Sequence, residues 1–192
     1  MRRKRNLTGS LLMCGLLALS TAAVAQAGSD TGMAAPGAGT SQLSAADRQF
    51  VKKAAEGGMA EVELGKLAVD KGGAEDVKKF GQRMVDDHSK ANDQLKQLAS
   101  SKNVTVPDGL NAKDKATKAR LEKLSGAQFD RAYMSDMVKD HEQDITEFNH
   151  ESKMGKDSDV KDFASQTLPT LKDHLKNARS VASQTGSAKS SM

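Results

Sequence analysis

The 192-residue chain has one cysteine, one tyrosine and no tryptophan. Its cysteine, Cys14, lies inside an apolar segment near the N-terminus, so the remainder of the chain carries no thiol. A disulfide framework in the folded domain is therefore excluded, and the domain's stability has to come from a packed core. The shortage of aromatic side chains also argues against binding of nucleic acid by base stacking.

Long hydrophobic runs are missing as well. The most apolar stretch covers residues 11–19 and is much shorter than the roughly 20 residues that a membrane-spanning helix needs. Four basic residues at positions 2–5 precede it, and Ala25-Gln26-Ala27 follows it as a small-x-small cleavage site. This pattern predicts a secretory signal peptide over residues 1–27 and no integral membrane span in the mature chain.

Net charge is the third feature that is small. Of the 29 Lys and Arg residues, four fall in the predicted signal peptide, which leaves 25 basic against 25 acidic residues after cleavage. A mature chain of zero formal charge argues against nucleic acid or anionic lipid as a partner. We expect an exported protein, periplasmic or associated with the outer membrane.

Composition divides the rest of the chain. Residues 28–43 are rich in Gly, Ser, Ala and Thr without periodic apolar positions, which is typical of a flexible linker, and residues 183–192 form a similar tail. Between them, residues 44–182 show apolar positions at three- and four-residue spacing and no alternating strand pattern. These residues are predicted to form one all-α domain.

Four long amphipathic segments are predicted, over residues 44–71, 74–101, 125–154 and 158–182. Ser44 is expected to cap the first, and Ser125 with Gln128 to form a capping box on the third. Residues 102–126 connect the second and third segments and include a short amphipathic piece at 116–124. Short outer connections with a long central one predict a ferritin-like four-helix bundle.

Four polar residues interrupt the apolar stripes, one on each helix: Glu61, His88, His141 and His174. Each lies about 14 to 16 residues from an end of its helix, or roughly 21 to 24 Å at about 1.5 Å per residue. The four side chains can therefore meet at one level of the bundle. Three imidazoles and a carboxylate suit Zn, Fe, Mn or Cu, so these residues are candidate metal ligands.

Other interpretations of these residues are open. The histidines can equally be hydrogen-bonded core residues of a metal-free structural or interaction module. Met84 and Met137 lie one turn before two of the histidines and would suit copper, although methionine in a stripe is usually core filler. An aspartate precedes each histidine and can orient an imidazole on a neighbouring helix or be solvated; these are Asp87, Asp140 and Asp173.

Catalysis is not predicted. The chain has no Gly-rich phosphate loop and no Ser-His-Asp or Cys-His arrangement. Di-iron bundles carry Glu-x-x-His on two helices, but here Val85, Val138 and Leu171 stand three residues before the histidines. A di-iron redox enzyme is therefore the least favoured class.

Several motifs together resemble a known family: AEVELGKLA at residues 60–68, MVDDH at 84–88, FDRAYM at 129–134, and LP at 168–169 followed by HL at 174–175. The chain resembles the bacterial domain of unknown function 4142 family, whose members are often labelled outer membrane proteins and assigned to the ferritin-like superfamily. The resemblance covers residues 48–182. It implies a ferritin-like fold, export and an association with stress responses, and it implies no established reaction.

Overall fold

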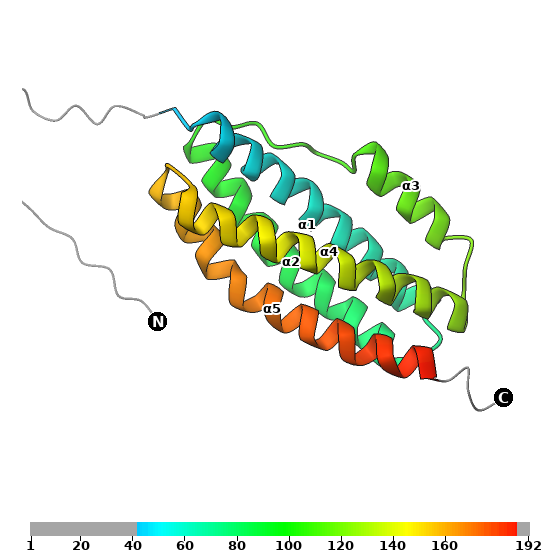
Figure 1. Cartoon of the computed structure of the whole chain (residues 1–192). Helices are drawn as coiled ribbons and strands as arrows, with labels where there is room; N and C mark the ends of the chain where they lie inside the picture. The colour runs from blue at the N-terminus through cyan, green and yellow to red at the C-terminus, as the bar shows by residue number, and fades with distance from the viewer. Residues whose placement is uncertain (1–41, 188–192) are drawn as a thin grey trace, which may run out of the picture. The chain divides into compact units, whose positions relative to one another are not determined.

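The computed structural model describes residues 42–187, which form five α-helices and no β-strand (Figure 1). The all-helical class predicted from the sequence is therefore confirmed. The predicted signal peptide, nearly all of the predicted linker, and residues 188–192 lie outside the described residues. The helices are α1 (Ala45–Lys71), α2 (Glu75–Ser101), α3 (Ala112–Leu121), α4 (Gly126–Met154) and α5 (Ser158–Ser187).

The four long helices pack as two hairpins. α1 lies along α2 and α4 along α5, and the hairpins meet where α1 contacts α4 and α2 contacts α5 (Figure 1). Glycine allows α1 and α2 to approach closely, because a Cβ added at Gly65 would lie 2.6 Å from the carbonyl oxygen of Gly81. This close approach accounts for the small residues on the packing face of α1.

The long connection contains the fifth helix. The sequence predicted a short amphipathic piece at 116–124, whereas α3 begins four residues earlier and ends at Leu121. The side chain of Asn111 caps it by accepting a hydrogen bond from the backbone N–H of Asp114 at 2.9 Å. Because α3 contacts both α1 and α4, it lies over the side of the bundle where these two helices meet.

Of the two helix caps predicted from the sequence, the structure has one. The Ser44 side chain accepts a hydrogen bond from the backbone N–H of Asp47 at 3.1 Å, so the predicted cap of α1 is confirmed. The predicted capping box on α4 is wrong, because the side chain of Ser125 makes no cap hydrogen bond. Gly126, the first residue of α4, adopts φ +54°. The first turn therefore lacks the regular helical backbone that a capping box requires.

Two buried aspartates fasten the hairpin loops. Asp130 accepts hydrogen bonds from the backbone amides of residues 73–74, both at 2.9 Å. Asp47 accepts hydrogen bonds from the backbone amides of residues 156–157, both at 3.0 Å. Charge-assisted bonds of this kind are stronger than neutral ones, so each loop is tied to a helix of the opposite hairpin.

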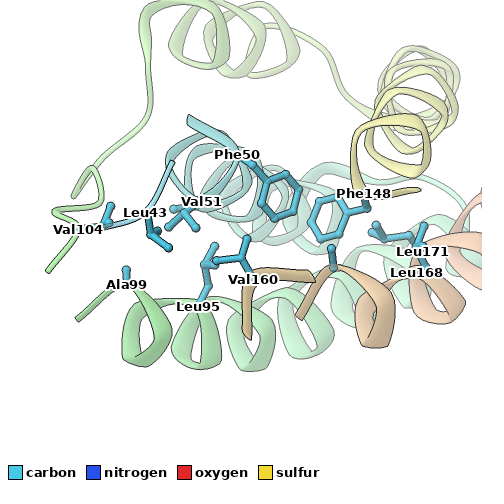
Figure 2. Packing of buried hydrophobic residues seen from close by; sticks show 12 residues of the cluster. Leu43, Phe50, Val51, Leu95, Ala99, Val104, Phe148, Val160, Leu168 and Leu171 are labelled. Atoms are coloured by element: carbon cyan, nitrogen blue, oxygen red, sulfur yellow. The ribbon is translucent and has the colours of Figure 1, made fainter. Parts of the chain in front are cut away.

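The core consists of two hydrophobic clusters. In the first, the Phe50 and Phe148 rings meet edge to face with centroids 4.9 Å apart (Figure 2). The second contains Leu64, Phe80 and Tyr133. It extends to Val181 near the end of α5, and α5 itself continues to Ser187, five residues beyond the predicted end of the domain. Among residues 42–187, no helix combines the length and the apolar character that crossing a bilayer requires.

Candidate metal centre

A buried polar layer separates the two hydrophobic clusters. On each long helix, one polar residue stands between the part that enters the first cluster and the part that enters the second. The exposed fractions of these four residues are 1% for Glu61, 6% for His88, and 0% for both His141 and His174. The structure therefore brings the four residues singled out in the sequence to one level of the bundle.

The three imidazoles converge. Their ring centroids lie 5.9 Å apart for His88 and His141, 5.3 Å for His88 and His174, and 5.4 Å for His141 and His174. One ring nitrogen from each lies within 4.8 Å of those of the other two. A metal ion bound at about 2.0 to 2.1 Å from each nitrogen requires separations below about 4.2 Å, which is close to the 4.8 Å within which these nitrogens lie.

Hydrogen bonds fix the tautomers of the first two rings. His141 Nδ1 lies 2.9 Å from the carbonyl oxygen of Met137, and since a carbonyl can only accept, Nδ1 carries the proton. His88 Nδ1 lies 2.8 Å from Glu61 Oε2 and donates to this carboxylate. In both neutral rings the lone pair is therefore on Nε2.

The ring of His174 adopts the other tautomer, with its proton on Nε2. His174 Nε2 lies 2.8 Å from Asp87 Oδ2 and donates to it, which leaves the lone pair of the neutral ring on Nδ1. Arg83 holds Asp87 in turn, with Nε 3.2 Å from the same carboxylate oxygen. Within the described part of the chain, the buried ring nitrogens without a hydrogen-bond partner are His88 Nε2, His141 Nε2 and His174 Nδ1.

Glu61 lies beside the imidazoles. Its Oε2 accepts from His88, while its Oε1 has no hydrogen bond in residues 42–187 and lies 3.3 Å from His141 Nε2. Burial opposes ionisation of Glu61, but the charges of His88 and His141 and the hydrogen bond from His88 outweigh burial and lower its pKa to about 2. Glu61 is thus an ionised group that orients one imidazole, and its predicted role as a direct ligand stays a prediction.

The imidazoles differ in basicity. Burial and repulsion by the other two histidines outweigh the hydrogen bond to Asp87 and lower the pKa of His174 to about 4, so this ring is neutral at pH 7. For His88, burial is outweighed by the charge and hydrogen bond of Glu61, and its pKa is raised. A metal ion at His88 Nε2 would have to compete with a second proton on the ring, which the charge of Glu61 favours, while the Nδ1 proton stays bonded to Glu61.

The three aspartates that precede the histidines have three different environments. Asp87 orients His174 across the α2–α5 contact, as one interpretation of the sequence predicted. Asp173 bonds to Arg83 and its side chain is 59% exposed. Asp140 is half-buried near Glu61; burial and the charge of Glu61 raise its pKa to about 7.

The remaining candidates lie elsewhere. Met84 and Met137 are buried in the second hydrophobic cluster, where methionine acts as core filler. His150, the fourth histidine of the chain, is exposed on α4. Sequence reasoning missed Asp144, one turn after Asp140, whose pKa burial and the charges of Glu61 and Asp140 raise well above its ordinary value. The like-charged pair at i and i+4 was the available signal, since such pairs are unfavourable on a free helix surface.

Comparison with known proteins supports the family and the fold. The family model described as Domain of unknown function (DUF4142) matches residues 32–181. A solved structure titled as the crystal structure of a DUF305 fragment from Deinococcus radiodurans is similar with a TM-score of 0.66 and 13% identity, covering 74% of this chain and 98% of that one. This likeness shows a shared helical fold alone. No curated protein matches the chain.

Proposed function

Because this chain belongs to the DUF4142 family, whose description names no activity, we propose a function from its own side chains. We propose that the protein binds a transition metal ion through His88 Nε2, His141 Nε2 and His174 Nδ1. Glu61 and Asp87 orient two of these rings, and the backbone of Met137 orients the third. Partners of this kind behind metal-binding histidines fix the tautomer and raise the basicity of the ligand.

One observation carries the proposal. Each buried imidazole uses one nitrogen in a hydrogen bond and has no partner for the other, and the three unpartnered nitrogens belong to rings that face one another. An unsatisfied buried polar atom costs about 1–3 kcal/mol. Three such atoms in one place are difficult to explain by packing, whereas a shared ion would satisfy all of them.

The ligand set favours a borderline metal. Imidazole nitrogen suits Zn, Fe and Cu, and three histidines with an open fourth position are typical of zinc sites. Mn remains compatible if a carboxylate such as Glu61 completes the shell. The fourth position can be filled by Glu61 Oε1, which lies 3.3 Å from His141 Nε2, or by an external molecule.

The cellular setting is part of the proposal. The basic and apolar pattern of residues 1–27 supports export to the bacterial envelope, and the four long helices support a ferritin-like four-helix bundle as the scaffold. An envelope stress response is the role that the family resemblance implies. Mass spectrometry of protein from a bacterial host tests export, because cleavage after Ala27 leaves Gly28 at the N-terminus; an intact Met1 in protein from the envelope fraction contradicts it.

Zinc binding by the untagged chain tests the metal site. After stripping with a chelator, the protein should take up one Zn²⁺ per chain by elemental analysis. It should also gain about 2.7 kcal/mol of stability when free Zn²⁺ is about 100 times its Kd. The double variant His88→Ala, His141→Ala should lose both effects, while His150→Ala, which removes an exposed histidine of α4, should lose neither. Substoichiometric zinc and an unchanged melting temperature in the wild-type protein would refute the proposal.

A metal-free structural module is the second candidate function. The observation that favours it is the ion pair between His88 and Glu61 at 2.8 Å, which lets protein groups compensate each other's buried charge. In that case the wild-type protein ignores Zn²⁺, and removing His88 alone is strongly destabilising because Glu61 is left as an uncompensated charge. The zinc titration therefore separates the two functions.

A further inference from the structure

Three carboxylates gather on the side of the polar layer that faces the contact between α1 and α4. Glu61 comes from α1, and Asp140 and Asp144 come from successive turns of α4. One carboxylate oxygen from each lies within 4.8 Å of the other two. Glu61 is fully buried and the two aspartates are half-buried, so their mutual repulsion is only partly screened by water.

The described residues do little to offset this repulsion. Asp140 and Asp144 have no hydrogen bond or ion pair with a described side chain, unlike Asp87 and Asp173, which Arg83 holds. Lys113 of α3 is the cation whose charge acts on both Asp140 and Asp144. Buried carboxylates normally have a close cationic partner or bind a cation, and here Lys113 acts only from a distance.

Two further observations point to a ligand at this cluster. Glu61 Oε1 is a fully buried oxygen without a hydrogen bond in residues 42–187, and it belongs to the carboxylate that lies among the aspartates. A cavity of about 20 Å³ also lies next to two of the three carboxylates: Glu61, Asp144 and His88 line its polar side, and most of its other lining residues, among them Gly57, are small or apolar. A Cβ added at Gly57 would meet no atom within 4 Å. A cavity of this size holds one water-sized species.

We propose that Glu61, Asp140 and Asp144 form a second cation site, for a hard divalent ion such as Mn²⁺, beside the three-histidine site. Oxygen donors of this kind select Mg²⁺, Ca²⁺ and Mn²⁺ over softer metals. The proposal goes beyond the histidine site, because Asp140 and Asp144 take no part in that site and the second cation binds to carboxylate oxygens instead of imidazole nitrogens. The two positive charges of this ion also offset part of the negative charge of the three neighbouring carboxylates.

Glu61 is common to both sites and separates them. Its Oε2 accepts the hydrogen bond from His88, whereas Oε1 faces His141 Nε2 at 3.3 Å, and neither of these last two atoms has a hydrogen bond among the described groups. When an external molecule fills the fourth position of the histidine site, Glu61 Oε1 is left to the second ion, and each of the two atoms acquires its own partner. The contact between His141 Nε2 and Glu61 Oε1 therefore lies between the positions proposed for the two ions.

Manganese titration of the zinc-charged protein tests the second site. The full chain is loaded with one equivalent of Zn²⁺ and titrated with Mn²⁺ by calorimetry, while electron paramagnetic resonance counts the free Mn²⁺. Wild-type protein should bind one Mn²⁺ and retain its zinc. Asp144→Asn should bind Mn²⁺ at least about tenfold more weakly with unchanged zinc content. Asp162→Asn, which alters an exposed aspartate of α5, should match wild type.

Thermal unfolding separates a ligand role from a structural one. Without metal, Asp144→Asn should melt no lower than wild type, because it removes a carboxyl group whose ionisation burial and the neighbouring carboxylates oppose. With Mn²⁺, wild type should gain stability and the variant should not. Absence of Mn²⁺ binding by wild type, or equal Mn²⁺ affinity in wild type and Asp144→Asn, overturns this site while zinc binding stays intact. Failure of the histidine site appears separately, as absence of zinc in every protein.

Discussion

Asp87 gives the sharpest test of how the protein prepares its imidazoles. Its Oδ2 accepts the hydrogen bond from His174 Nε2 at 2.8 Å and thereby leaves the lone pair of the ring on Nδ1. In Asp87→Ala, the ring is free to rotate and to hold its proton on the nitrogen that should bind the metal. Loss of an orienting partner of this kind typically weakens metal affinity by about 10- to 100-fold.

The environment of Asp87 narrows this range. His174 is fully buried, but the side chain of Asp87 is 38% exposed, so water can replace part of the lost hydrogen bond. We therefore expect a loss of about 10- to 30-fold, which corresponds to about 1.4 to 2 kcal/mol of binding free energy. Asp87→Asn should lie between wild type and Asp87→Ala, because the amide oxygen still accepts but carries no charge.

Asp173→Ala is the matched control. Arg83 bonds to both aspartates, at 3.2 Å for Asp87 and 2.7 Å for Asp173, but only Asp87 reaches His174. Competition against a chromophoric zinc chelator at fixed pH and salt measures all the affinities. If Asp87→Ala and Asp173→Ala weaken zinc binding equally, or if neither changes it by more than about twofold, the orienting role of Asp87 is wrong.

Two further predictions concern the scaffold. Gly57→Ala should stabilise α1 by up to about 1 kcal/mol, because the added Cβ meets open space. Gly65→Ala should destabilise the protein by about 1–3 kcal/mol, because the added Cβ would lie 2.6 Å from the carbonyl oxygen of Gly81. Urea unfolding measures both effects, and equal effects would contradict the close approach of α1 and α2. Burial and the charge of Asp47 raise the pKa of Glu151 to about 7, so the folded chain keeps a proton that the unfolded chain releases near 4.5. The free energy of unfolding should fall as pH rises through this window. Glu151→Gln should lose that part of the pH dependence and exceed wild-type stability at pH 8 by on the order of 1–3 kcal/mol; an identical profile in both proteins refutes the assignment.

Periodicity in the sequence was sufficient for the long helices and for the residues of the polar layer. The three- and four-residue spacing that places Leu64 or Met137 in the core also places Glu61 and His141 there. The bonds of Asp47 and Asp130 to distant loops could not be predicted, because their partners are backbone amides 109 and 57 residues away. Every residue except proline carries such an amide, so sequence patterns give no sign of which one is used.

The details of the site depend on helix order more than on spacing. The spacing of Asp140 and Asp144 marks an unfavourable pair of charges on α4, but it does not show that Glu61 of α1 lies beside them. Likewise, the spacing predicts that Glu61 lies near the histidines, but it does not predict that Oε2 bonds to His88. That choice depends on side-chain rotamers, which the neighbouring helices set.

Helix order also explains why one Asp-His dipeptide has different surroundings on α2, α4 and α5. The residue before a core histidine lies about 100° around the helix, so it faces one flank of its helix. Neighbouring helices in this bundle run in opposite directions (Figure 1), and the side to which that flank turns therefore alternates. Asp87 and Asp173 face each other's helices across the α2–α5 contact, while Asp140 faces α1 and meets Glu61.

Within the α2–α5 contact, Asp87 and Asp173 bond to different partners, and only Asp87 accepts a hydrogen bond from a histidine. His88 Nδ1 donates to Glu61 on the other side of α2, and Asp173 bonds to Arg83. His174 Nε2 donates to Asp87, which lies on the neighbouring helix α2. The same geometry thus gives an orienting aspartate on α2, a surface ion pair on α5, and a carboxylate cluster on α4.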